Sequence, residues 1–182
     1  MLALLRPAIA LSVFFLLLTG LAYPLAITGA AQIMFPFQSN GSQLTSNGAF
    51  VGSALIGQGW AADIYFHSRP SAVKYDASNS SGSNLGPSSK TLIAAVAANA
   101  ATLGGSNIPV DLVTASGSGL DPDISPAGAL FQAARVARAR NISEDRVRQL
   151  IAANTQGPEL GILGEPHVNV LELNLALDAL KP

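Results

Sequence analysis

The sequence predicts an α+β domain that follows one N-terminal transmembrane helix. Three observations support this fold class: an uncharged apolar run close to the N-terminus, apolar residues at helical spacing in the C-terminal half, and short apolar stretches between polar loops. The chain has 182 residues, which is enough for one ordinary domain and one further element. We therefore expect one membrane helix and one folded domain.

The apolar run covers residues 7–27 and contains no charged residue. Hydrophobic residues make up 49% of the chain and charged residues only 12%, about half the usual share, and this run accounts for part of the imbalance. A helix of about 20 residues is roughly 30 Å long, which matches the hydrocarbon thickness of a bilayer. A cleavable signal peptide is the alternative, with small residues at 29–31 as its cleavage region, but the run is longer than a typical signal core.

Charge around the run predicts its orientation. Arg6 precedes it, and no charged residue follows until Asp63. By the positive-inside rule, the N-terminus lies in the cytoplasm and the domain lies outside. The expected organisation is a cytoplasmic segment 1–6, a transmembrane helix 7–27, a linker 28–47, and an extracytoplasmic domain 48–182.

The first part of the domain is predicted to contain few regular elements. Residues 35–47 are rich in turn-forming residues and are expected to be a loop, whereas residues 50–56 are expected to form a strand or a close-packed turn. Residues 63–89 are dense in Ser, Asn, Gly and Pro and predict a long ordered loop. Residues 109–114 alternate in polarity and predict a strand.

Four helices are predicted from local signals. The Ala-rich stretch 91–103 follows a capping Ser88 or Ser89 and ends at a pair of glycines. The other three each begin behind a side chain that can cap a helix N-terminus: Ser125 before a proline, Ser143 before two acids, and Asn169 before a leucine stripe.

No motif for catalysis or cofactor binding is complete. Lys90 and Thr91 could end a phosphate-binding loop, but Asn84 and Ser89 stand where that loop needs glycine. His67 and His167 are the only histidines, which argues against a zinc site or hydrolytic triad and favours ordinary surface or hydrogen-bonded roles. We therefore predict no catalytic, cofactor-binding or metal-binding residue.

Three further features limit the function. The absence of cysteine excludes disulfides and thiolate chemistry, and the mildly acidic domain argues against a nucleic-acid partner. Asp121 and Asp123 flank a proline in a turn that either organises its own backbone or offers oxygens to a cation. Five arginines in the C-terminal half are interpreted as a solvated face, partly neutralised by nearby acids: Arg135, Arg138, Arg140, Arg146 and Arg148.

Six stretches occur in an order that resembles one family, the C subunit of the Kdp-type potassium-transporting P-type ATPase. They are GSALIGQ (52–58), YFHSRPSA (65–72), SGSNLGP (81–87), VDLVTAS (110–116), SGLDPDISP (118–126) and VNVLELNL (168–175). Together with the N-terminal anchor they cover nearly the whole chain. Ser68 stands where the family often has glycine, and Asp123 where many members have histidine, which argues against an essential acid–base role at position 123.

The resemblance implies a non-catalytic accessory subunit in the cell (inner) membrane. Its partners would be a channel-like potassium-translocating subunit, an ATP-hydrolysing subunit, a very small accessory subunit, and membrane lipid. The family is described as a catalytic chaperone that raises the ATP affinity of the hydrolysing subunit. Because ATP is cytoplasmic, we expect this effect to be indirect, with ATP, Mg²⁺ and potassium handled by the partners.

Candidate interface or loop-anchoring residues lie in these stretches. Arg69 sits between two aromatic residues and a proline, and its planar fork suits a carboxylate or backbone carbonyls in the domain or on a neighbouring subunit. The full candidate set is Gln58, Tyr65, Phe66, Arg69, Asn84 and Asp121. The rival hypothesis is an exported ligand-binding domain or enzyme with a simple membrane tether.

Overall fold

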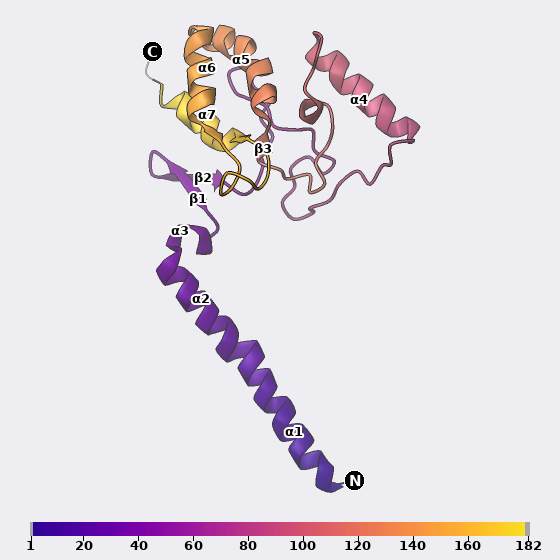
Figure 1. Ribbon diagram of the computed structural model, residues 1–182, viewed down its shortest axis with the longest axis vertical. Coiled ribbons are helices and arrows are strands. Elements are labelled where there is room, and N and C mark those ends of the chain that lie inside the picture. Colours follow the sequence, from indigo (N-terminus) through magenta and orange to yellow (C-terminus); the bar gives the residue numbers. More distant parts are fainter. Residues whose placement is uncertain (1, 181–182) are drawn as a thin grey trace. The chain divides into compact units, whose positions relative to one another are not determined.

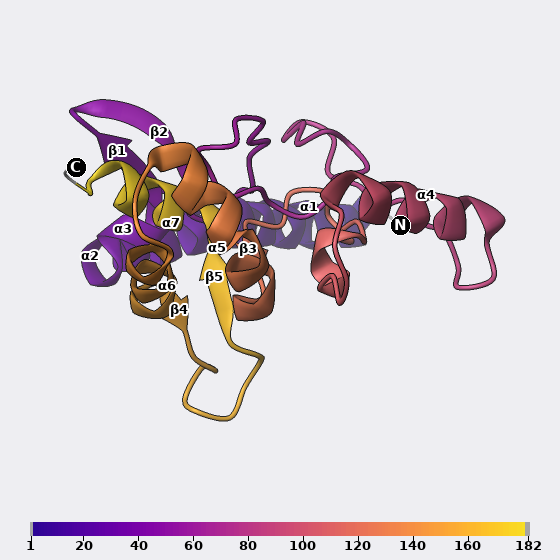
Figure 2. The same cartoon turned by 90° about the horizontal axis from the view of Figure 1, so that it is seen from above.

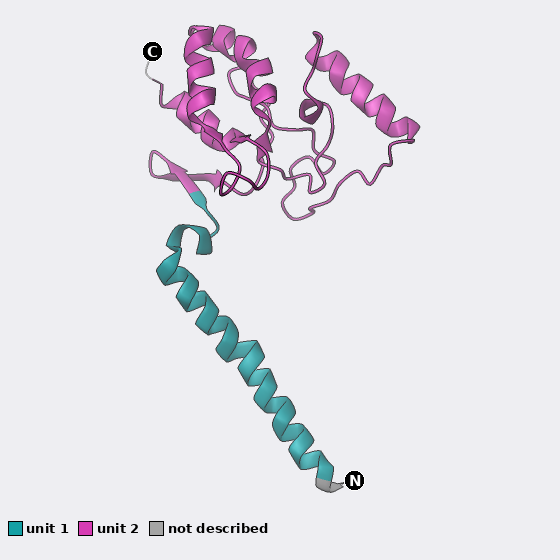
Figure 3. Ribbon diagram, in the orientation of Figure 1, with its two compact units in different colours: residues 1–43 teal, residues 44–182 magenta. Residues whose placement is uncertain are grey.

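The computed structural model describes the backbone of residues 2–180 and the side chains of residues 4–180, and it divides into two compact units (Figure 3). Unit 1 is Met1–Gln43 and unit 2 is Leu44–Pro182. The two units are described separately below.

Unit 1 is one long helical rod followed by a short helix. The rod consists of α1 (Leu2–Leu17), a π-helical turn (Leu18–Ala22) and α2 (Tyr23–Met34), and α3 (Pro36–Ser39) follows. The π-turn lies just before Pro24, which has no N–H to donate to the preceding turn, and Thr19 Oγ1 donates to Phe15 O at 2.7 Å beside it. The segment Leu4–Met34 is long and apolar enough to cross a membrane, consistent with single-pass anchoring.

The predicted linker 28–47 contains regular structure. It includes the end of α2, all of α3 and the strand β1 (Gln43–Ser46). This strand pairs with β2 (Ala49–Ser53). Asn47 and Gly48 join the two strands with positive φ angles of 52° and 78°, as a two-residue hairpin turn requires.

The core of unit 2 is a group of three helices on a small antiparallel sheet (Figures 1 and 2). The helices are α5 (Pro126–Arg140), α6 (Glu144–Ala153) and α7 (Val170–Asp178), and the sheet has the order β3 (Asp123–Ile124), β5 (His167–Asn169), β4 (Thr155–Gln156). Asp123 pairs with Asn169, and Thr155 with Val168. Apolar side chains from all three helices and from the sheet form one buried cluster, so this is the α+β domain that the sequence predicts.

The four predicted helices are present with the predicted caps. The side chains of Ser89, Ser125, Ser143 and Asn169 each accept a hydrogen bond from the backbone N–H three residues later. The Ala-rich helix α4 (Lys90–Leu103) ends at Gly104 with φ of 66°. Figure 1 shows α4 set apart from the α5–α7 group, and none of its residues is fully buried.

The predicted strand at 109–114 is wrong. Residues Val110–Leu112 form a 3-10 helix, and both the N–H and the hydroxyl of Thr114 donate to Val110 O. Leu112 and Val113 are both buried, whereas Val110 is exposed, so side chains do not alternate between two faces. The polarity pattern over six residues was too short to distinguish a strand from this turn.

The long loop predicted at 63–89 is confirmed, because no helix or strand lies between β2 and α4. Phe66 nevertheless joins the core and is fully buried.

Candidate functional site

The candidate site is built around residues 63–69, which we call the clamped loop because helix side chains hold its backbone. Two fully or nearly buried amides provide the central contacts. Asn174 of α7 accepts from Phe66 N at 2.8 Å and donates to Phe66 O at 3.0 Å. Gln132 of α5 does the same for His67, at 2.8 and 3.0 Å. The amides replace the neighbouring strand that an extended segment would otherwise need.

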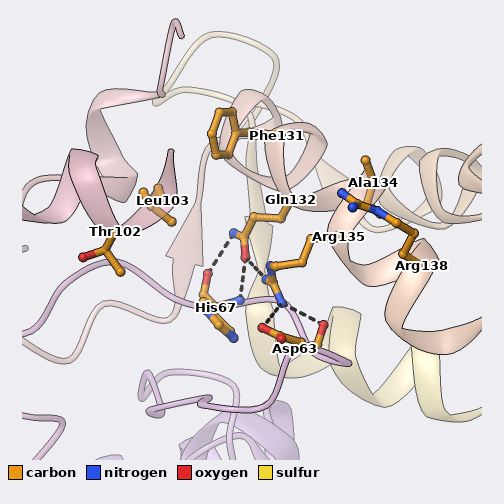
Figure 4. Close-up of a pocket in the computed structure, with 9 residues that line it drawn as sticks. All are labelled: Asp63, His67, Thr102, Leu103, Phe131, Gln132, Ala134, Arg135 and Arg138. Atoms are coloured by element: carbon orange, nitrogen blue, oxygen red, sulfur yellow. Dashed lines mark hydrogen bonds and ion pairs between the residues drawn. The ribbon is translucent and has the colours of Figure 1, made fainter. Parts of the chain in front are cut away.

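Two arginines of α5 bind further backbone carbonyls of the clamped loop. Arg135 donates to Asp63 O at 2.7 Å and also contacts Gln132, as Figure 4 shows. It donates to Tyr65 O as well, at 3.0 Å. Arg140 donates to Ile64 O at 2.8 Å. The interpretation of the arginine cluster as a solvated face is therefore wrong for these two residues, because their donors are used inside the fold.

Tyr65 of the clamped loop is held by side chains at the C-terminal ends of α5 and α7. Its hydroxyl donates to Asp178 Oδ2 at 3.1 Å, and Arg140 donates to the other oxygen of this carboxylate at 2.5 Å. The Arg140 guanidinium carbon lies 5.0 Å from the centre of the Tyr65 ring, within range of a cation–π interaction. Trp60 packs against the Tyr65 ring with centroids 4.7 Å apart. Tyr65 thus links the loop to the end of α7.

Arg69 has an acid partner 52 positions away. It donates to Asp121 Oδ2 at 2.9 Å, with side chains that are 26% and 27% exposed. The other oxygen of Asp121 accepts from Asp123 N at 3.1 Å, so the turn around Pro122 is organised by its own side chain, as one of the two sequence hypotheses proposes. Tyr75 donates its hydroxyl to Arg69 O, and burial raises the pKa of this phenol.

Gln58 connects the β2 region to the loop. Its side-chain amide donates to Val51 O at 3.0 Å, and its backbone carbonyl accepts from Ser68 Oγ at 3.1 Å. One residue earlier, Gly57 N donates to Leu120 O at 2.7 Å. A Cβ at position 57 would lie 2.4 Å from Asp121 O, so this approach requires glycine.

His67 and Asp123 have shifted pKa values. Burial, and then the charge of Arg135, lower the pKa of His67, whose Nε2 lies 3.2 Å from Ala62 O. Burial raises the pKa of Asp123, and the neighbouring Asp121 adds to this, while His167 and Asn169 act in the opposite direction. Among the residues that the structure describes, no group of three or more acids or histidines is placed to hold a metal ion.

A cavity of 330 Å³ lies beside the clamped loop. Figure 4 shows His67, Gln132 and Arg135 on one side of it and Thr102, Leu103 and Phe131 on the other. The functional groups that Gln132 and Arg135 bring to it already bind the loop backbone. The cavity lies between residues of α4, of α5 and of the clamped loop.

The structure brings five of the six candidate residues into one connected region: Gln58, Tyr65, Phe66, Arg69 and Asp121. Asn84 is not part of it, because it is exposed and adopts a left-handed backbone conformation with φ of 54°. An interface role for these residues stays a prediction. Sequence reasoning did not single out Gln132 or Asn174, and it placed Arg135 and Arg140 on a solvated face. A lone Asn within the leucine stripe of α7 is nevertheless a signal that a buried polar contact exists there.

Comparison with known proteins covers the whole of this architecture. Residues 5–179 match the family described as K⁺-transporting ATPase, c chain (KdpC). A potassium-transporting ATPase KdpC subunit from Caulobacter vibrioides is 58% identical, over 100% of this chain and 96% of the relative. Those from two strains of Rhodopseudomonas palustris are 52% and 55% identical, over 97% and 96% of each chain. Because the match includes the apolar helix, the clamped loop and α7, the chain belongs to the family of KdpC subunits of the potassium-transporting ATPase.

Proposed function

We propose that the chain is a non-catalytic accessory subunit of a high-affinity, ATP-driven potassium uptake complex, in which it stabilises assembly and modulates the ATP-hydrolysing subunit. The observation that carries this proposal is the end-to-end match to subunits of one transporter, from the apolar helix to α7. Its partners are the potassium-translocating subunit, the ATP-hydrolysing subunit and the small accessory subunit. Catalysis resides in a partner.

The proposed topology places the N-terminus in the cytoplasm and unit 2 outside. Arg6 precedes the apolar helix, and residues 28–62 carry no charge, which supports this orientation. Protease added to intact spheroplasts is expected to digest unit 2 while leaving cytoplasmic proteins intact. Digestion of unit 2 only after lysis would contradict the topology.

The proposed effect on ATP binding is conformational. An ATP-driven pump alternates between states, and a subunit that binds one state better than another shifts the equilibrium between them. By linkage, this subunit changes the affinity of the pump for ATP by the same factor as ATP changes the affinity of the pump for this subunit. This holds although the two bind on opposite sides of the membrane. No nucleotide contact with this chain is needed.

Co-purification tests the assembly role. With a tag on the ATP-hydrolysing subunit, detergent extraction is expected to recover this chain together with the potassium-translocating subunit. A membrane-tethered enzyme or ligand-binding domain, the rival hypothesis, would not be recovered with the tagged subunit. Complexes prepared without the chain are expected to need more ATP for half-maximal hydrolysis, and an unchanged ATP requirement would contradict the modulating role.

Direct nucleotide binding can be excluded by titration. Ser89 caps α4 and Asn84 has a side chain where a phosphate loop needs glycine, so we expect the full-length chain in detergent to bind Mg-ATP weakly at most. Lys90 is then simply the first residue of α4. Micromolar binding that is lost in Lys90→Ala would contradict the indirect route.

A further inference from the structure

Three of the most exposed aliphatic side chains in unit 2 lie together on one loop. Residues 157–166 join β4 to β5, and within this loop Leu160 is 87% exposed, Ile162 81% and Leu163 58%. We call these three residues the apolar tip. Figure 2 shows the loop extending away from β4 and β5. Large aliphatic side chains scattered singly on a surface need no explanation, but three within four residues form a patch.

The apolar tip is held in a defined conformation. Glu159 N donates to Leu163 O at 2.8 Å, and Leu163 N donates to Glu159 O at 2.9 Å, which closes the turn like the end of a hairpin. Gly161 N also donates to Pro158 O at 3.0 Å. Leu160 adopts φ of 53°, a conformation that residues with a Cβ rarely take. The turn thus holds Leu160 in a strained backbone conformation with its side chain exposed to solvent. Strained residues of this kind are concentrated at functional sites.

The charges around the apolar tip favour a protein partner over lipid. Residues 155–172 contain three glutamates and no Lys, Arg, Trp or Tyr. Segments that insert into the membrane interface rely on aromatic and basic anchors, and anionic headgroups repel acids. Association with a second copy is disfavoured as well, because a symmetric contact would bring Glu159 and Glu165 of one copy against those of the other.

We infer that the apolar tip is a docking element for another subunit of the potassium-transporting ATPase, which receives it in an apolar groove with basic residues at its rim. The inference rests on the proposed function and deepens it, since it assigns one surface of this chain to assembly. Leu160 and Ile162 fill the groove, and Glu159 and Glu165 face the basic rim. The preformed turn lowers the ordering cost of binding.

Substitution of the apolar tip in the complete complex tests the inference. Leu160→Asn introduces a residue that tolerates positive φ, and Ile162→Thr keeps a β-branched side chain. The double variant therefore removes the apolar contact without altering the backbone. Each aliphatic side chain transferred from water to an apolar groove contributes about tenfold or more to affinity. The double variant, which changes two such side chains, is therefore expected to lose about a hundredfold in affinity for the complex, with an unchanged melting temperature.

The matched control is Ile93→Thr with Val110→Thr, two exposed aliphatic positions in α4 and the 3-10 helix. This control is expected to co-purify like the wild type. If the wild type and the tip variant are retained equally, the inference is wrong while the proposed function stands. If the wild type itself fails to co-purify with any subunit, the proposed function is wrong.

Two further measurements identify the partner. A photo-reactive amino acid at position 162 is expected to cross-link this chain to another subunit, whereas cross-links only to lipid, only to a second copy, or to nothing would overturn the inference. Reversal of charge in Glu159→Lys with Glu165→Lys leaves the apolar tip intact. This charge-reversed variant is expected to bind the complex more weakly than the wild type. The loss of affinity with added salt that the wild type shows is expected to be absent from the variant. Unchanged salt dependence would exclude the basic rim.

Discussion

Asn174 offers the sharpest test of the clamped loop. Asn174→Leu places an apolar side chain of similar size among the leucines of α7 and removes both hydrogen bonds to Phe66. The N–H and carbonyl of Phe66 then stay buried without partners, because this residue is fully buried. Each of the two unsatisfied groups costs about 1–3 kcal/mol, so the free energy of unfolding should fall by about 2–6 kcal/mol.

Thermal unfolding of the full-length chain in detergent measures this loss. For a domain of this size, about 3 °C of melting temperature corresponds to 1 kcal/mol, so the midpoint should fall by about 6–18 °C. The single tryptophan, Trp60, packs against Tyr65 and reports on the loop directly, and its emission should shift to longer wavelength.

Asn154→Ala is the matched control for this variant. Its side chain makes one hydrogen bond, to Leu150 O at 2.8 Å at the end of α6, and its loss should cost below about 1 kcal/mol. A free energy of unfolding for Asn174→Leu within about 0.5 kcal/mol of the wild type, with unchanged Trp60 emission, would refute the clamp as a source of stability.

Three further substitutions test the surroundings of the loop. Arg69→Ala should lower the free energy of unfolding by about 1–2 kcal/mol, because it breaks the contact with Asp121; unchanged melting with weakened assembly would instead show that Arg69 acts at an interface. Gly57→Ala should lower the free energy of unfolding by about 2–4 kcal/mol, because the new Cβ would meet Asp121 O. The control Gly86→Ala, which has open space around its Cβ, should leave the free energy of unfolding unchanged or raise it slightly. Equal melting temperatures of the two variants would contradict the close approach at Gly57. Since burial and Arg135 lower the pKa of His67, the stability that neutral His67 contributes is complete above the usual pKa of 6.5 and is lost as the pH falls from there toward the folded-state pKa. Urea unfolding across this range should therefore show a shallower pH dependence of the free energy of unfolding in His67→Gln than in the wild type. Identical pH dependence in the two proteins would exclude the effect.

Much of the helical structure was predictable because its signals are local. The caps at Ser89, Ser125 and Ser143 each act over three residues, a distance that the sequence itself specifies. The three-stranded sheet was not predictable in this way, since strands of two or three residues are too short to carry an alternating pattern.

The candidate site was predictable only in part. Tyr65, Phe66 and Arg69 stand out in a polar loop, but their partners lie far away in the chain: Asn174 is 108 positions from Phe66, and Asp121 is 52 positions from Arg69. Nothing in the local sequence of α5 distinguishes Arg135, which binds loop carbonyls, from Arg138, whose Nε bonds within its own helix.

Local sequence signals were enough to predict an apolar helix able to span a membrane, four capped helices and a long polar loop, because each depends on residues within a few positions of one another. Tertiary structure alone decided that Gln132 and Asn174 hold the loop as a neighbouring strand would, and that Gly57 must lack a side chain beside Asp121. These contacts join segments far apart in the chain. Their geometry exists only once the core has packed, because burial is what makes an unpaired backbone group costly.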